Sequence, residues 1–169
     1  QENILQAALK LFAENGYNAT ATSKVAKEAG VSEGLIFRHF GNKEGLLKAI
    51  MEMGREQTAL IYEQILAMPE PRQKLRAILE IPFTIEQEQY HFWKLLYSIK
   101  WQSDTYDYSI SAPLRGELVK IFTELGYEDP EAEAEVVFLL LDGIAMMKLL
   151  RQEEDEQAIL QVIFEKYDL

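Results

Sequence analysis

Apolar residues recur every three or four positions along nearly the whole chain, and no sustained strand-like alternation interrupts them. This spacing marks one face of an α-helix, whereas a half-buried strand alternates at every second residue. The pattern therefore predicts an all-α protein of about nine helices. The first helix ends at Asn15-Gly16, because glycine tolerates the positive φ that closes a helix.

Two further short helices are predicted soon after the first. One covers about residues 22–29 and ends at Gly30, and the other follows the N-cap residue Ser32 and ends at Phe40. Gly41-Asn42 breaks this third helix. Three short helices in succession predict a separate N-terminal domain over residues 1–45.

Longer helices are predicted for a C-terminal domain over residues 46–169. A helix from Lys43 to about Met68 connects the two domains and ends before Pro69. The following helix starts near Pro71 and is kinked or broken near Pro82, because proline cannot donate a backbone hydrogen bond.

The remaining helices follow from the same apolar spacing. Helices over 89–101 and 114–125 flank a polar, turn-forming segment that is predicted to be a loop. Asp129 is suited to cap the next helix and Pro130 to occupy its first position, and that helix runs to about Arg151. A last apolar helix follows an acidic run.

Composition narrows the class of protein. The chain has 169 residues, of which 48% are hydrophobic and 27% charged, so it can bury a real core. It contains no cysteine, which excludes a disulfide scaffold, a thiolate metal site and a cysteine nucleophile. The most apolar stretch, residues 136–150, carries Asp142 and Lys148, so we predict no membrane-spanning helix, no membrane partner and a cytoplasmic location.

The net charge of −11 argues by itself against a nucleic-acid partner, since phosphate binding favours a basic surface. The charge is unevenly distributed, however. Residues 1–48 hold six basic and five acidic residues, a net charge of +1, whereas the remainder holds 11 basic and 23 acidic residues, a net charge of −12. A near-neutral head on an acidic body fits a chain whose N-terminal end approaches an anion.

The second and third predicted helices have the size and the tight glycine-containing turn of a helix-turn-helix, in which the second helix enters the DNA major groove. Val25, Ala26 and Val31 are predicted to lock the pair, while Ile36 and Phe40 pack inward. The side chains suited to bind phosphate are Thr22, Ser23 and Lys43.

This stretch resembles the DNA-binding domain of the TetR family of bacterial transcriptional regulators. The resemblance covers about residues 4–47 and rests on Ala29-Gly30-Val31-Ser32, Gly34, Phe37-Arg38-His39-Phe40 and Lys43-Glu44. It implies a homodimer that binds palindromic operator DNA, most often as a repressor. It also implies that a small-molecule inducer binds in the C-terminal domain and releases the DNA.

The resemblance further implies roles for nine residues of the helix-turn-helix. Phosphate contacts are expected from Thr22, Ser23, Phe37, His39 and Lys43. Base contacts are expected from Glu33, Gly34, Leu35 and Arg38. Two positions depart from the family pattern: Phe37 replaces a tyrosine and so lacks a hydroxyl, and Glu33 puts a carboxylate near phosphates, although a carboxylate can accept a hydrogen bond from cytosine N4.

Two further sets of residues, predicted mainly for the C-terminal domain, are candidates for a ligand pocket and for a dimer interface. A mostly apolar ligand pocket is predicted to be lined by Tyr62, Phe83, Tyr90, Phe92, Trp93, Tyr97, Trp101 and Phe122. A dimer interface is predicted to involve Val136, Val137, Leu140, Gly143, Ile144, Met147, Ile159, Ile163 and Phe164. In both sets the same apolar spacing is also that of an ordinary core, and this alternative stays open.

Two other classes of protein compete with a regulator. Glu88 and His91 have the Glu-x-x-His spacing of carboxylate-bridged metal enzymes, but such sites need two motifs and the chain has only two histidines. The sequence contains no phosphate-binding glycine loop and no nucleophile elbow. We therefore predict no enzyme, no metal and no cofactor. An acidic protein-interaction module is the other alternative, and it leaves the pattern over residues 16–44 unexplained.

Overall fold

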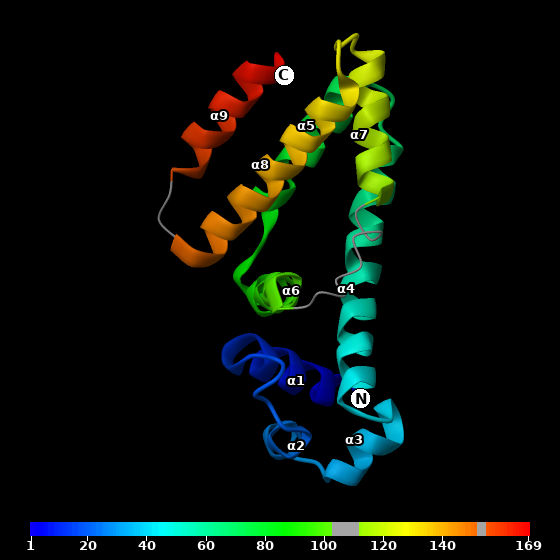
Figure 1. Ribbon diagram of the computed structural model, residues 1–169, viewed down its shortest axis with the longest axis vertical. Coiled ribbons are helices and arrows are strands. Elements are labelled where there is room, and N and C mark those ends of the chain that lie inside the picture. Colours follow the sequence, from blue (N-terminus) through cyan, green and yellow to red (C-terminus); the bar gives the residue numbers. More distant parts are fainter. Residues whose placement is uncertain (103–111, 152–154) are drawn as a thin grey trace. The chain divides into compact units, whose positions relative to one another are not determined.

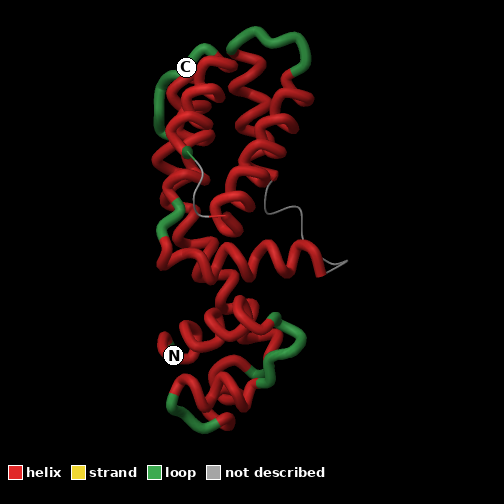
Figure 2. Tube along the Cα trace, turned by 90° about the vertical axis from the view of Figure 1, so that its left-hand side faces the viewer, coloured by secondary structure: helices red, strands yellow, loops and turns green. Residues whose placement is uncertain are grey.

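The computed structural model describes residues 1–102, 112–151 and 155–169. These residues form nine α-helices and two short 3₁₀ turns, with no strand among them (Figures 1 and 2). The predicted all-α fold is confirmed. No helix in the described ranges combines the length and the apolar character needed to cross a membrane.

The three short N-terminal helices are α1 (Glu2–Asn15), α2 (Thr22–Ala29) and α3 (Glu33–Phe40). The residues that follow them, Gly16, Gly30 and Gly41, cap their C-terminal ends, and each of these glycines has a positive φ. A residue with a Cβ would be strained in that backbone region, so these glycines set the lengths of the helices.

The later elements are α4 (Lys43–Leu66), α5 (Pro71–Glu80), the 3₁₀ turns η1 (Ile81–Thr84) and η2 (Gln87–Gln89), α6 (Tyr90–Gln102), α7 (Ala112–Glu124), α8 (Pro130–Arg151) and α9 (Glu156–Tyr167). The predicted break at Pro82 is the turn η1. The Asp129 carboxylate accepts a hydrogen bond from Ala132 N at 3.0 Å, which confirms the predicted cap of α8. Most of the loop predicted over 102–113 lies outside the described residues.

Two compact units make up the chain. The first comprises Gln1–Ile61 and Gln87–Tyr106, and the second comprises Tyr62–Glu86 and Asp107–Leu169. Each unit is a set of residues that pack mainly against one another, so the two units describe packing and not function. The functional division at residue 45 stays a prediction.

The core of the first unit joins α1, α2 and α3 to the first turns of α4 and to α6. Fully buried side chains come from all five helices: Ala8, Phe12, Val25, Ile36, Leu46, Ile50 and Leu95. α1 packs against both α2 and α6. The helix-turn-helix is therefore built on a scaffold whose centre is α1.

The second unit has a core of its own, in which α5, α7, α8 and α9 meet. Its fully buried side chains include Leu75, Ile78, Leu79, Leu118, Phe122 and Val137. Lys74 and Glu117 form an ion pair of 2.8 Å between α5 and α7, and both side chains are largely shielded from solvent. The Lys74 hydrogen bond holds the pKa of the Glu117 carboxyl below its ordinary value.

Candidate nucleic-acid interface

The candidate nucleic-acid interface is the pair of helices α2 and α3. Gly30 adopts the left-handed conformation (φ 67°) between them, and Val31 N donates a hydrogen bond of 3.0 Å to Ala26 O. Val25 and Ile36 are fully buried, so each helix has one face fixed against the core. This tight turn and the two buried anchors set the orientation of α3 within the first unit.

The opposite face of α3 is open to solvent. Gly34, Phe37 and Arg38 are exposed, and their spacing of three and four residues places them on one side of the helix. Phe37 is 44% exposed and thus lies at the surface of the chain. Leu35, by contrast, is half-buried and packs against the core of the first unit.

Thr22 and Glu33 meet at the start of the two helices. Thr22 Oγ1 donates a hydrogen bond of 2.5 Å to Glu33 Oε1, which brings together one predicted phosphate contact and one predicted base contact. Ser23 is exposed beside them. Sequence reasoning assigned these residues separate roles and did not anticipate the bond, because nothing in the local pattern links positions 11 residues apart.

Lys43 and His39 are held by residues to which the sequence analysis gave no role. Lys43 Nζ donates a hydrogen bond of 3.2 Å to Asn18 O and lies 4.4 Å from the centre of the Tyr17 ring. His39 Nδ1 is 3.1 Å from the Gln1 amide nitrogen. Tyr17 and Asn18 lie within residues 4–47, the stretch that the family resemblance covers, and this position was the available signal that they support the interface.

The junction between α3 and α4 is crowded. The Asn42 side chain accepts a hydrogen bond of 2.7 Å from Gly45 N, so Asn42 caps α4. A methyl group on Gly45 would overlap the Phe40 carbonyl oxygen. Glycine is therefore required here by the close approach of two backbones, and this approach fixes where α3 ends relative to Lys43.

Several cations on this part of the chain are free of ion pairs. Lys24, Lys27 and Arg38 are exposed, and none forms an ion pair with another residue in the described ranges. Lys10 differs, since it pairs with Glu28 at 2.8 Å, and this hydrogen-bonded carboxylate raises the pKa of Lys10 above its ordinary value. Lys24, Lys27 and Arg38 are thus available to an anionic partner.

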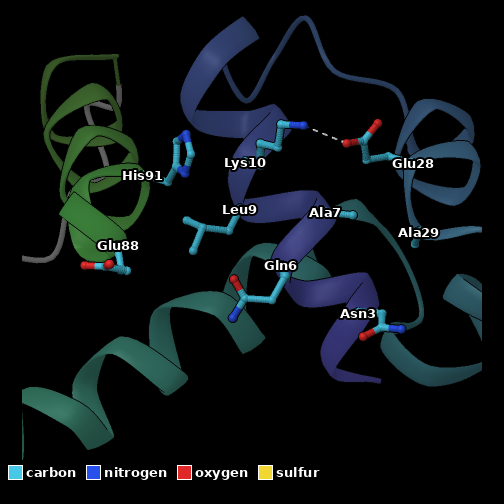
Figure 3. Close-up of a pocket in the computed structure, with 9 residues that line it drawn as sticks. All are labelled: Asn3, Gln6, Ala7, Leu9, Lys10, Glu28, Ala29, Glu88 and His91. Carbon is cyan, nitrogen blue, oxygen red and sulfur yellow. Dashed lines mark hydrogen bonds and ion pairs between the residues drawn. The ribbon is translucent and has the colours of Figure 1, made fainter.

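A shallow cleft of about 410 Å³ lies beside α1, with side chains from α2, η2 and α6 around it (Figure 3). His91 on α6 faces α1, and its Nε2 lies 3.6 Å from Glu14 Oε1. The lining residues are Asn3, Gln6, Ala7, Leu9, Lys10, Glu28, Ala29, Glu88 and His91. Within the described part of the chain no three histidine or carboxylate side chains gather as a metal site would require, so the Glu88–His91 spacing gains no support.

The eight aromatic residues predicted to line a ligand pocket are divided between the two units. Tyr90, Phe92, Trp93, Tyr97 and Trp101 belong to the first unit, and Tyr62, Phe83 and Phe122 to the second. Phe122 is fully buried, with its ring 4.9 Å from that of Tyr127, whereas Trp101 is 77% exposed. The pocket stays a prediction.

The residues predicted for a dimer interface fall on two faces of their helices. Val137, Ile144, Ile163 and Phe164 are buried in the core of the second unit. Leu140, Met147 and Ile159 are half-buried, whereas Val136 and Gly143 are exposed.

Val136, Leu139, Gly143 and Leu150 form an exposed row along α8, here called the α8 stripe. Leu139 is 66% exposed and Leu150 is 73% exposed. Sequence reasoning named Val136 and Gly143 but missed these two leucines, because its other α8 residues, such as the buried Val137 and Ile144, lie on the neighbouring face. Leu139 lies three residues after Val136 and Leu150 seven residues after Gly143, and this helical spacing could have indicated that the four share one face.

Comparison with known proteins identifies the N-terminal helices. The sequence model for "Bacterial regulatory proteins, tetR family" matches residues 4–50, which hold α1, α2, α3 and the start of α4. Residues 4–50 thus match the TetR family. The uncharacterized HTH-type transcriptional regulator YvkB of Bacillus subtilis, a curated relative, is 43% identical over 63 residues, or 37% of this chain and 33% of YvkB. The chain thus spans about a third of that relative.

Two further comparisons extend beyond the TetR-type N-terminal helices. The HTH-type transcriptional regulator BetI of Vibrio campbellii is 27% identical over 97% of this chain and 87% of its own. The structure of the regulator FadR from Bacillus subtilis, solved in complex with stearoyl-CoA, superposes with a TM-score of 0.66 at 22% identity, covering 97% of this chain and 95% of FadR. The fold that this chain shares with FadR therefore extends past the N-terminal helices.

Proposed function

We propose that this chain is a transcriptional regulator, and not an enzyme, that binds duplex DNA with α3 in the major groove. The observation that carries the proposal is that one face of α3 is buried in the core and the opposite face is exposed. Ile36 is fully buried, while Gly34, Phe37 and Arg38 share an exposed face. A helix fixed on one side and open on the other, with a free guanidinium, is suited to reach base edges.

The proposed contacts divide into two kinds. Bases are contacted by Glu33, Gly34, Leu35 and Arg38, and phosphates by Thr22, Ser23, Phe37, His39 and Lys43. Lys43 is supported by its position over the Tyr17 ring, since a preordered ammonium loses less entropy when it meets a phosphate. Residues 1–45 would carry these contacts, and residues 46–169 the ligand and partner contacts.

The proposed active form is a homodimer, which would bind a palindromic operator through two copies of α3. The α8 stripe supports this proposal, because leucines exposed by 66% and 73% on one helix face are costly in a lone chain. A methyl group on Gly143 would meet no atom within 4 Å. That open space admits the close approach of a second helix.

Release from DNA is proposed to follow binding of a small molecule in the C-terminal domain, so that the protein acts as a repressor in the cytoplasm, where bacterial DNA lies. The support is the match of residues 4–50 to the TetR family together with the fold shared with FadR. Stearoyl-CoA is the first probe to test, since FadR was solved with it. Loss of DNA binding on addition of stearoyl-CoA, with palmitic acid and free coenzyme A as controls, would assign the ligand class.

Fluorescence anisotropy tests the central proposal. The purified chain is titrated onto duplex DNA from upstream of its own gene and onto random duplex DNA of equal length, across a range of salt concentrations. We expect the upstream DNA to bind at least about 10³-fold more tightly, with an affinity that falls steeply with salt. Equal and weak binding to both duplexes would contradict a specific regulator.

A further inference from the structure

The contact between Thr22 and Glu33 joins two side chains that compete for DNA. A threonine hydroxyl has a single proton to donate. Thr22 Oγ1 already donates that proton to Glu33 Oε1 at 2.5 Å. The same proton therefore cannot reach a phosphate oxygen until the Thr22–Glu33 bond breaks.

The Glu33 carboxylate is also not neutralised by a cation. No lysine, arginine or histidine in the described ranges forms an ion pair with it. Glu33 stands at the first position of α3, close to the exposed face that carries Gly34, Phe37 and Arg38. A phosphate that approaches Thr22 thus meets both an occupied hydroxyl and an unpaired negative charge.

We propose that Glu33 gates the Thr22 phosphate contact and makes it depend on the base sequence. On binding, a phosphate takes the Thr22 hydroxyl and the freed carboxylate accepts a hydrogen bond from a base amino group in the major groove, cytosine N4 or adenine N6. At a site that lacks an amino group there, the Thr22–Glu33 bond is lost without replacement. The gate therefore raises specificity by penalising wrong sites, and it rests on the proposed function of α3.

A double-mutant cycle separates the gate from plain charge repulsion. The four proteins are the wild type, Thr22→Val, Glu33→Ala and the double variant, each titrated onto one random 30-bp duplex at fixed salt. Valine keeps the shape of threonine without its hydroxyl, and Thr22→Ser is the matched control that keeps the hydroxyl. Melting curves check that all the variants fold alike.

The gate predicts a non-additive result. Glu33→Ala should tighten binding to the random duplex by about fivefold more in the wild-type background than in the Thr22→Val background, because only a threonine hydroxyl is released by the change. The same factor in both backgrounds would show that Glu33 acts by charge alone. That outcome would overturn the gate and leave DNA binding by α3 intact, whereas no DNA binding by any of the four proteins would overturn both proposals.

Selection from a random DNA pool tests the second half of the gate. The wild type should select cytosine or adenine at one position of each half-site, and Glu33→Ala should lose that preference alone. Glu33→Gln should shift the preference towards adenine, because an amide matches adenine N6 and N7 together. An unchanged preference in Glu33→Ala would refute base reading by Glu33.

Discussion

Phe37 presents a ring without a hydroxyl on the exposed face of α3, where it is 44% exposed. We predict that Phe37→Tyr tightens DNA binding by about fivefold, because the added hydroxyl can donate a hydrogen bond to a phosphate. Anisotropy on the upstream duplex measures the change. Phe37→Leu is the control, since it alters the ring without adding a donor. Equal affinity of the Phe37→Tyr variant and the wild type would remove Phe37 from the phosphate contacts.

Tyr167 is a buried residue of the second unit whose hydroxyl finds no hydrogen-bond partner among the described residues. Burial raises the pKa of Tyr167 to about 12, whereas an unfolded tyrosine ionises near pH 10. Between these values the unfolded chain has already lost the proton, so stability falls as pH rises from about 10 to 12.

Tyr167→Phe should therefore leave the free energy of unfolding at pH 7 unchanged or slightly higher, because it removes an unsatisfied buried hydroxyl. Above pH 10 the variant should retain roughly 1–3 kcal/mol that the wild type loses. Urea unfolding at pH 7 and pH 11 measures both effects. A variant clearly less stable at pH 7 would show that the hydroxyl has a partner after all.

For the ion pair between Lys74 and Glu117 we predict the opposite pH dependence: its contribution to stability is lost in acid. Because the pKa of Glu117 lies below its ordinary value of 4.5, the carboxylate contributes stability above that pH and loses it as the pH falls through the lower value. Glu117→Gln should cost about 1 kcal/mol at pH 7 and less below pH 4. Glu80→Gln is the matched control, since the Arg76–Glu80 pair is exposed, and its cost should stay under about 0.5 kcal/mol.

At the scale of elements, the contact between α4 and α6 in the first unit depends on a missing side chain. A methyl group on Gly54 would overlap the ring of Phe92. Gly54→Ala should therefore destabilise the chain by about 1–3 kcal/mol, and Phe92→Leu should restore part of the loss.

The control for this change is Gly116→Ala on α7, where a methyl group would meet no atom within 4 Å. This variant should gain roughly 0.5–1 kcal/mol, because alanine is the better helix former. Chemical unfolding of the wild type and these variants tests the pair of predictions. Equal stabilisation by both alanines would mean that α4 and α6 are not in contact at Gly54.

The helices could be predicted from the sequence because their ends are local. Gly30 and Pro130 act through their own backbone, and no distant residue is needed to interpret them. Which face of α8 lies inward could not be predicted in the same way, because Val136 and Val137 are equally apolar. That choice is made by α5 and α7, which bury Val137 and leave Val136 exposed.

For the candidate nucleic-acid interface, too, local features could be predicted and contacts between separate segments could not. The apolar pattern placed Ile36 inward and the family resemblance implied that Arg38 faces outward, and the structure has Ile36 buried and Arg38 exposed. The bond between Thr22 and Glu33 and the stacking of Lys43 on Tyr17 join separate segments, and pair geometry of this kind follows from the fold alone.

At the scale of the whole molecule, the α8 stripe decides the proposed state of assembly. Leu139→Glu should convert the protein to a single chain of 19.5 kDa at micromolar concentration, because a carboxylate would have to be buried in the interface. It should also weaken DNA binding, while the stability of the single chain stays nearly unchanged.

The matched control is Leu60→Glu on α4, a change at another leucine exposed by 63% that lies outside the stripe. Light scattering measures the mass of each variant. A wild type of single-chain mass would refute the dimer, and a Leu139→Glu variant that keeps double mass would place the interface elsewhere.

The exposure of Leu139 and Leu150 has a consequence for dosage. If two copies must meet along the α8 stripe before an operator is bound, operator occupancy at concentrations below the dimerisation constant rises with the square of the concentration of the chain. A twofold drop in the concentration of the chain would then lower operator occupancy about fourfold. The gene would respond to how much of its regulator is present as well as to any inducer.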